Sequence, residues 1–162
     1  MNYDQVKNPE AQRFLRSFFM HREINQEFYR LVPEDQYDFK MTPKGDSIVR
    51  NLAHQIKVQR WYWRKAVGKT QKIEGETEKL QQKTKSELLQ LLDQEDQKMV
   101  DLLSDEIAIN KTFETKWSDK PVTVVQNYWG LYEHEILHTG IIICFMEHLN
   151  MPRFDKLKYF WG

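Results

Sequence analysis

The sequence has few of the residues that mark several protein classes. Its single cysteine, Cys144, excludes an intramolecular disulfide and a cysteine-based zinc cluster. Glycine and proline make up roughly 7% of the chain against an average of about 12%, which argues against turn-rich all-β folds. The 24 basic and 24 acidic side chains cancel, so the basic excess of a general nucleic-acid binder is missing.

Long apolar runs are also missing. The longest, residues 141–146, is far shorter than the ~20 residues of a membrane span. The first ten residues hold no apolar stretch of the kind found in secretory signals. We therefore expect a cytoplasmic protein with neither membrane nor nucleic-acid partners. The length of 162 residues predicts a single domain over residues 1–162.

Four stretches have the start signals and the apolar spacing of amphipathic helices. Asn8 is a good N-cap for the first, and Asp46 or Ser47 for the second. Thr84 and Thr123 each begin a capping-box pattern, for the third and fourth. The expected helices cover residues 9–32, 47–67, 84–103 and 123–149.

These helices predict an all-α fold, a four-helix bundle. Residues 31–46 form a long first crossover connection, because they contain two prolines and a glycine and exceed the usual connection of about 2–8 residues. The polar residues 69–85 are expected to be a solvated connection. In residues 107–117 apolar and polar side chains alternate loosely, a pattern that fits either a short strand or an extended loop.

The second helix has apolar residues on two sides, where a bundle helix needs one. It also carries three consecutive aromatic residues, Trp61, Tyr62 and Trp63. We predict a homodimer with surface from this helix in its interface.

The strongest chemical motif is HEILH, residues 134–138. On a helix, His134 and His138 lie about 40° apart and ~6 Å along the axis, so both imidazoles can reach one ion. Their face also holds the apolar Ile141 and Phe145, besides Asn127 and Gly130, which marks it as the inward face. The alternative is a structural pair that bonds to backbone and neighbouring side chains.

A metal site needs a third ligand from elsewhere. His148 lies ~15 Å along the helix from His138 and cannot bind the same ion. His21, on the apolar face of the first helix, and His54, in the middle of the second, are both candidates. His54 is the better placed of the two, but geometry alone leaves the choice open.

HEILH also fits the zinc-peptidase pattern, with Glu135 as general base. The longer form of that pattern wants glycine and histidine where this chain has Ile141 and Cys144. We therefore keep a zinc peptidase only as a minor alternative, and expect Glu135 to be a groove or surface carboxylate. Cys144 is expected to pack, and His21 to be half-buried or at the rim of a cleft.

Four segments resemble the characteristic segments of a known family and follow one another in the same order. They are LVPEDQYDFKMTPKGDS after the first helix, SIVRNLAHQI, TKSELLQLLDQ, and EHEILHTG near the end. Over roughly residues 9–150 the chain resembles the DinB/YfiT-like bundle proteins of bacteria. The resemblance implies a homodimeric bundle with a divalent ion held by His54, His134 and His138.

Family members with assigned activities include low-molecular-weight thiol transferases and a thiol-dependent isomerase. The resemblance thus implies a metal-dependent enzyme of the thiol S-transferase or hydrolase type, acting on a small molecule such as a thiol. Nickel, zinc and iron all accept imidazole, so the sequence does not choose the metal. It assigns no catalytic residue beyond the ligands. The alternative is a non-catalytic metal-binding stress or interaction protein. The family often has apolar residues in place of Asn51 and Gln55.

Overall fold

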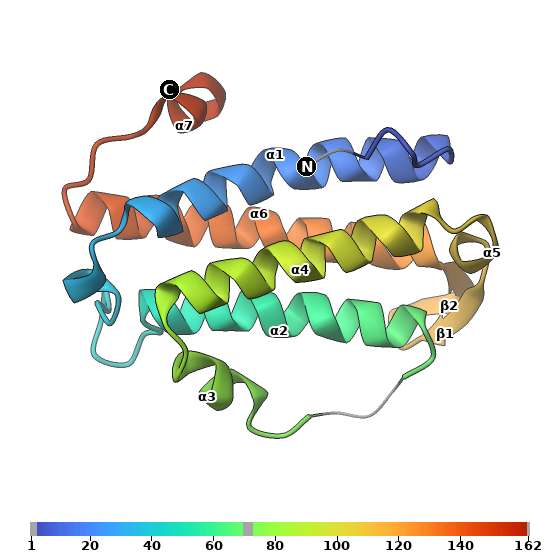
Figure 1. Ribbon diagram of the computed structural model, residues 1–162, viewed down its shortest axis with the longest axis horizontal. Helices are drawn as coiled ribbons and strands as arrows, with labels where there is room; N and C mark the ends of the chain where they lie inside the picture. The colour runs from blue at the N-terminus through green and yellow to red at the C-terminus, as the bar shows by residue number, and fades with distance from the viewer. Residues whose placement is uncertain (1–2, 70–72, 162) are drawn as a thin grey trace.

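The computed structural model describes residues 3–69 and 73–161. Within these residues, four long helices lie side by side (Figure 1). They are α1 (Pro9–Leu31), α2 (Ile48–Ala66), α4 (Lys85–Ser104) and α6 (Val124–His148). Helices α1 and α2 each pack against both α4 and α6. The expected mostly helical fold is confirmed.

Shorter elements join the long helices. Two strands, β1 (Thr112–Thr115) and β2 (Ser118–Thr123), form an antiparallel hairpin in which Phe113 pairs with Val122. This hairpin resolves the question over residues 107–117 and adds a small sheet to the expected all-α fold. The remaining described elements are η1 (Glu34–Gln36), α3 (Glu76–Gln81), α5 (Glu106–Ile109) and α7 (Asp155–Trp161).

The sequence signals for helix starts are confirmed. Asn8 Oδ1 accepts hydrogen bonds from the backbone amides of residues 10 and 11, and Ser47 Oγ accepts one from residue 50. Thr84 and Thr123 both form the full reciprocal capping box. These local bonds satisfy amides that a helix leaves free at its first turn, so they fix where each long helix begins.

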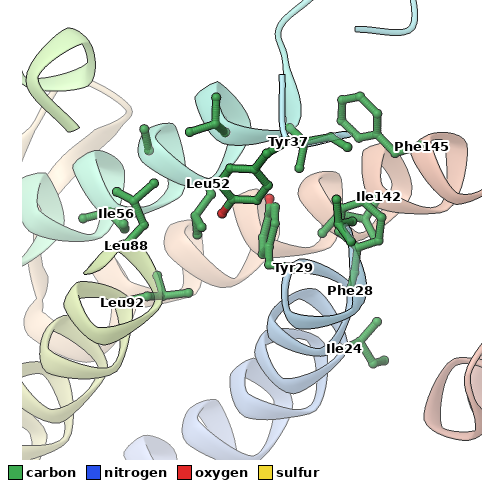
Figure 2. Close-up of a cluster of buried hydrophobic side chains, with 14 of the residues drawn as sticks. Ile24, Phe28, Tyr29, Tyr37, Leu52, Ile56, Leu88, Leu92, Ile142 and Phe145 are labelled. Atoms are coloured by element: carbon green, nitrogen blue, oxygen red, sulfur yellow. The ribbon is translucent and has the colours of Figure 1, made fainter. Parts of the chain in front are cut away.

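The connection between α1 and α2 is folded onto the core. Its backbone forms an antiparallel bridge between Lys40 and Ser47, and the amide of Val49 donates to the carbonyl of Tyr37. The Tyr37 ring is buried beside Tyr29 and Leu52 (Figure 2). Residues 69–85 were expected to be only a solvated connection, and this was wrong in part, because they contain α3.

Two hydrophobic clusters fill the space between the long helices. One, shown in Figure 2, takes residues from α1, α2, α4 and α6 and includes Ile24, Phe28, Leu52, Ile56, Leu88, Leu92, Ile142 and Phe145. The other includes Phe14, Phe18, Met99, Val100, Val125, Tyr128 and Leu131. On α4 and α6, buried polar side chains separate the two clusters. Among the described residues, no helix combines the length and apolarity that a membrane crossing requires.

Candidate metal centre

Three imidazoles from two helices meet at one point. The Nε2 atom of His134, on α6, lies 3.1 Å from Nε2 of His54, on α2, and 3.2 Å from Nε2 of His138. The ligand atoms of all three residues lie within 4.8 Å of one another. The site thus uses two positions one turn apart on α6 and one position on the helix packed against it.

The spacing of these nitrogens fits a metal ion. A first-row divalent ion binds imidazole nitrogen at about 2.1 Å, which places neighbouring ligand atoms about 3.0–3.4 Å apart for angles between 90° and tetrahedral. The two measured separations lie in this range. Hydrogen bonds alone satisfy the cluster less well than a metal ion would. A ring nitrogen either donates or accepts one hydrogen bond, and Nε2 of His134 faces two nitrogens.

Burial keeps the three imidazoles neutral. It lowers the pKa of His134 to about 4 and that of His138 to about 2, and each is lowered further by the charge of neighbouring histidines. Burial also lowers the pKa of His54, and Lys57 adds to that effect. A metal ion needs the neutral form of histidine, so the cluster has free lone pairs at neutral pH.

Asn51 fixes the tautomer of His138. Its Oδ1 atom lies 2.9 Å from Nδ1 of His138 and also accepts a hydrogen bond from the Tyr29 hydroxyl at 2.6 Å. Because an amide oxygen only accepts, Nδ1 carries the hydrogen and Nε2 keeps its lone pair for a metal. The Nδ1 atom of His134 is buried and has no hydrogen-bond partner among the described residues.

A buried polar layer lies beside the histidines. Arg22 of α1 is fully buried and donates to Gln55 at 3.1 Å and Gln59 at 2.6 Å, both on α2. It also pairs at 3.3 Å with Asp96 of α4 and at 3.3 Å with Glu135 of α6. One guanidinium therefore contacts all three of the other long helices. Two carboxylates face one cation, and burial raises the pKa of Asp96 to about 6 although Arg22 opposes the shift.

Glu135 belongs to this layer and is 1% exposed, so its expected place at the surface or in a groove was wrong. One carboxylate oxygen accepts a hydrogen bond from Asn25 at 2.6 Å and pairs with Arg22. Burial raises its pKa, against the effect of Arg22. These contacts turn the carboxylate toward α1, and it does not join the histidine group. The arrangement gives no support to a peptidase base at this position.

The remaining candidates lie outside the cluster. His21 is more buried than expected, at 4% exposed, and its Nδ1 lies 3.2 Å from the Thr139 hydroxyl. His148 is at the end of α6, as expected, with its ring against the carbonyl of Cys144. Cys144 is exposed, so its expected packing role was wrong.

The cluster opens on one side into a groove of about 480 Å³. We call it the histidine groove; it is lined by His54, Lys57, Val58, Trp61, Tyr62 and His134. Tyr62 packs closely over Gly130, where a Cβ would lie 2.7 Å from the tyrosine oxygen. Among the described residues, no further His, Cys, Asp or Glu joins the three-histidine group.

Sequence reasoning missed the supporting residues. Asn51 and Gln55 were predicted only to differ from the family pattern, and no role was predicted for Arg22. One signal was present in the sequence, because Arg22 lies between His21 and Asn25 on a helix whose neighbouring turns are aromatic.

The comparisons with known proteins support one family. No curated protein matches the chain. The family model of the DinB superfamily matches residues 20–142, which include His54, His134 and His138. This match covers most of the chain. The chain belongs to the DinB superfamily.

Proposed function

We propose that this protein binds one divalent metal ion through His54, His134 and His138 and uses it as an enzyme on a small molecule. The observation that carries the proposal is the convergence of three neutral imidazole nitrogens at ligand spacing. Thiol S-transfer and hydrolysis are the reaction types that we favour, and a low-molecular-weight thiol is one candidate substrate.

The open side of the cluster supports an enzyme over a purely structural site. His54 and His134 line the histidine groove, so a small molecule in the groove lies against two of the three imidazoles. Lys57 adds a cation to the rim, and Trp61 and Tyr62 add apolar walls. When bound, a divalent ion with neutral ligands supplies Lewis-acid activation of a water or a thiol. The role of the chain is to hold the imidazoles neutral and leave one side accessible.

The overall organisation is part of the proposal. We propose a single domain over residues 1–162, a four-helix bundle with a long first crossover, which acts in the cytoplasm as a homodimer. We propose neither nucleic acid nor a membrane as partner. The two-sided apolar character of α2 supports dimerisation. Light scattering at micromolar concentration tests it, and a mass near the 19.7 kDa of one chain would contradict it.

Elemental analysis tests the ligand set. Wild type, His54→Ala, His21→Ala and Glu135→Gln are purified after growth with the same metals. We expect about one ion per chain in wild type, His21→Ala and Glu135→Gln. Little metal is expected in His54→Ala, because two histidines rarely hold an ion. Full occupancy in His54→Ala would overturn the assignment, as would a wild type that stays empty after addition of nickel, zinc or iron.

Turnover separates the enzyme from the non-catalytic alternative. Metal-loaded protein is incubated with an electrophile and a panel of low-molecular-weight thiols, and separately with small esters and amides. We expect wild type to turn over at least one of these and His54→Ala to turn over none. Full metal occupancy without any turnover would favour the non-catalytic metal-binding protein.

A further inference from the structure

A second groove lies between the last turns of α2 and the β1–β2 hairpin, at the end of the molecule where Figure 1 shows these elements together. Its volume is about 590 Å³. We call it the hairpin groove; it is lined by Trp61, Arg64, Lys65, Lys69, Glu114, Thr115, Lys116 and Trp117.

The hairpin groove has two tryptophan side chains that the fold leaves about half exposed. Trp61 is 48% exposed and Trp117 is 61% exposed. They come from different elements, α2 and the turn of the hairpin. Exposed tryptophans on two sides of one groove suit a flat apolar group, because such rings stack on aromatic faces.

The charge of the hairpin groove is positive. Arg64 is already occupied, since its two terminal nitrogens contact Glu76 at 2.9 and 2.8 Å. Within the described part of the chain, no carboxylate forms an ion pair with Lys65, Lys69 or Lys116, and Glu114 supplies a single negative charge. Three unpaired ammonium groups and one carboxylate favour an anion.

Lys65 is held at the apolar wall of the groove. Its Nζ lies 5.0 Å from the centre of the Trp61 ring and 5.4 Å from that of Phe113. Partial burial there lowers the pKa of Lys65. A cation placed over two rings is fixed in position and partly shielded from water, so a carboxylate or phosphate beside it gains a charge-assisted hydrogen bond.

The two grooves share a wall, because Trp61 lines both. Trp61 follows His54 by seven residues on α2, which is about 10 Å along the helix axis. A small molecule that reaches the histidines with one end can therefore place its other end in the hairpin groove.

We propose that the hairpin groove binds a flat aromatic group that carries a carboxylate or phosphate, and that this group is the distal end of the substrate. The second part rests on the proposed function of the histidine site. The first part does not, because the groove is built without any metal ligand.

The test uses three small probes that share the naphthalene ring and differ in charge: 2-naphthoate, 2-naphthol and 2-(aminomethyl)naphthalene. Isothermal titration calorimetry with metal-free wild type is expected to show binding of 2-naphthoate. The neutral and cationic probes should bind at least about tenfold more weakly, because they lack the charge that the lysines favour. Equal affinity for 2-naphthoate and 2-naphthol would overturn the proposal.

Matched variants locate the binding. Trp117→Ala and the double variant Lys65→Met with Lys116→Gln should each weaken 2-naphthoate binding about tenfold. Lys120→Gln changes a lysine of the same hairpin that does not line the groove, and should bind as wild type does. Thermal unfolding confirms that each variant is folded. Unchanged affinity in Trp117→Ala would overturn the assignment.

The two parts of the proposal fail in different ways. His54→Ala should bind 2-naphthoate as wild type does, whether or not the metal site is correct. Loss of 2-naphthoate binding in His54→Ala would overturn a separate hairpin groove. If wild type is a dimer that does not bind 2-naphthoate, and Trp117→Ala dissociates that dimer, the groove binds a second copy of the chain and the proposal is overturned. If 2-naphthoate does not inhibit turnover by metal-loaded wild type, the distal end of the substrate does not bind in the hairpin groove.

Discussion

Asn51 Oδ1 lies 2.9 Å from Nδ1 of His138 and so decides which nitrogen of that ring faces the other histidines. The same oxygen accepts from Tyr29 and from Gln55 Nε2 at 3.2 Å. Asn51 is 5% exposed, so water does not replace these bonds easily. The amide is therefore a positioning group for His138.

Replacing this amide is expected to weaken metal binding. Asn51→Leu keeps a similar volume but leaves His138 Nδ1 and the Tyr29 hydroxyl without an acceptor. We expect the metal affinity to fall about 10- to 100-fold. The free energy of unfolding of the metal-free protein should fall by about 1–3 kcal/mol. Competition with a chromophoric chelator measures the affinity, and chemical denaturation measures the stability.

Two further variants control this experiment. Asn51→Asp keeps an acceptor for Nδ1, so it should hold metal at least as well as wild type. Asn110→Ala removes an exposed amide that donates locally to the carbonyl of Glu106, and should change nothing. If Asn51→Leu binds metal as tightly as wild type, Asn51 does not position His138.

Arg22 is expected to be the most sensitive residue of the polar layer. Arg22→Met fills a similar volume but leaves Asp96 and Glu135 buried without their cation. We expect it to lower the free energy of unfolding at pH 7 by about 3–5 kcal/mol. Glu135→Gln should change stability much less, because the amide oxygen still accepts from Asn25 and Arg22 then faces one carboxylate. Urea denaturation of both variants measures the contrast, and equal losses would contradict this account of the charges.

Asp96 gives the protein a specific pH dependence. Its pKa is raised from 3.8 to about 6 by burial, so the native state holds a proton that the unfolded state releases near pH 4. This contribution to stability is complete below about pH 4 and is lost as the pH rises through about 6. Its size over that window is of order 2–3 kcal/mol.

The buried histidines act in the opposite direction, so the effect of Asp96 is measured as a difference. The free energy of unfolding of wild type, minus that of Asp96→Asn, should fall as the pH rises from 4 to 7. Asp101→Asn, an exposed change on the same helix, should give a difference that is flat with pH. A flat difference for Asp96→Asn as well would show that Asp96 is ionised throughout.

The contact between Gly130 and Tyr62 predicts a coupled pair of substitutions. In Gly130→Ala the new methyl group would meet the Tyr62 oxygen at 2.7 Å and push the ring into the histidine groove. In Tyr62→Phe that oxygen is absent, and the next ring atom lies at 3.5 Å, an ordinary contact. Gly130→Ala should therefore stabilise only the Tyr62→Phe background, by up to about 1 kcal/mol from helix propensity. A double-mutant cycle from thermal unfolding measures the coupling, and additive effects would contradict it.

Local features of this fold were predictable from the sequence. The N-caps Asn8, Ser47, Thr84 and Thr123 bond within a few residues, so their patterns can be recognised without tertiary structure. Helix α3 was missed for the opposite reason. Its Glu76 forms ion pairs with Arg60 and Arg64 of α2. The spacing of apolar residues, which predicted the long helices, does not reveal ion pairs between distant segments.

The site divides in the same way. His134 and His138 are one helical turn apart, so their shared face follows from sequence spacing alone. The choice between His21 and His54 depends on how α1 and α2 pack on α6. Position on the helix slightly favoured His54, and the family resemblance decided for it. Arg22 and Glu135 were not expected inside, because charged residues are rarely buried. They are buried because their partners arrive from different helices.

The position of Arg22 also bears on when the metal enters. Its partners Gln55 and Glu135 are the residues next to His54 and His134 in the sequence. The contacts of Arg22 that align α2 with α6 therefore also bring His54 and His134 to the same level along the bundle axis. Sliding one helix by a single turn, about 5.4 Å, would break both sets of contacts. The alignment uses no metal ion. We therefore expect the chain to fold first and load its ion afterwards, unlike small zinc domains that are unfolded until metal arrives.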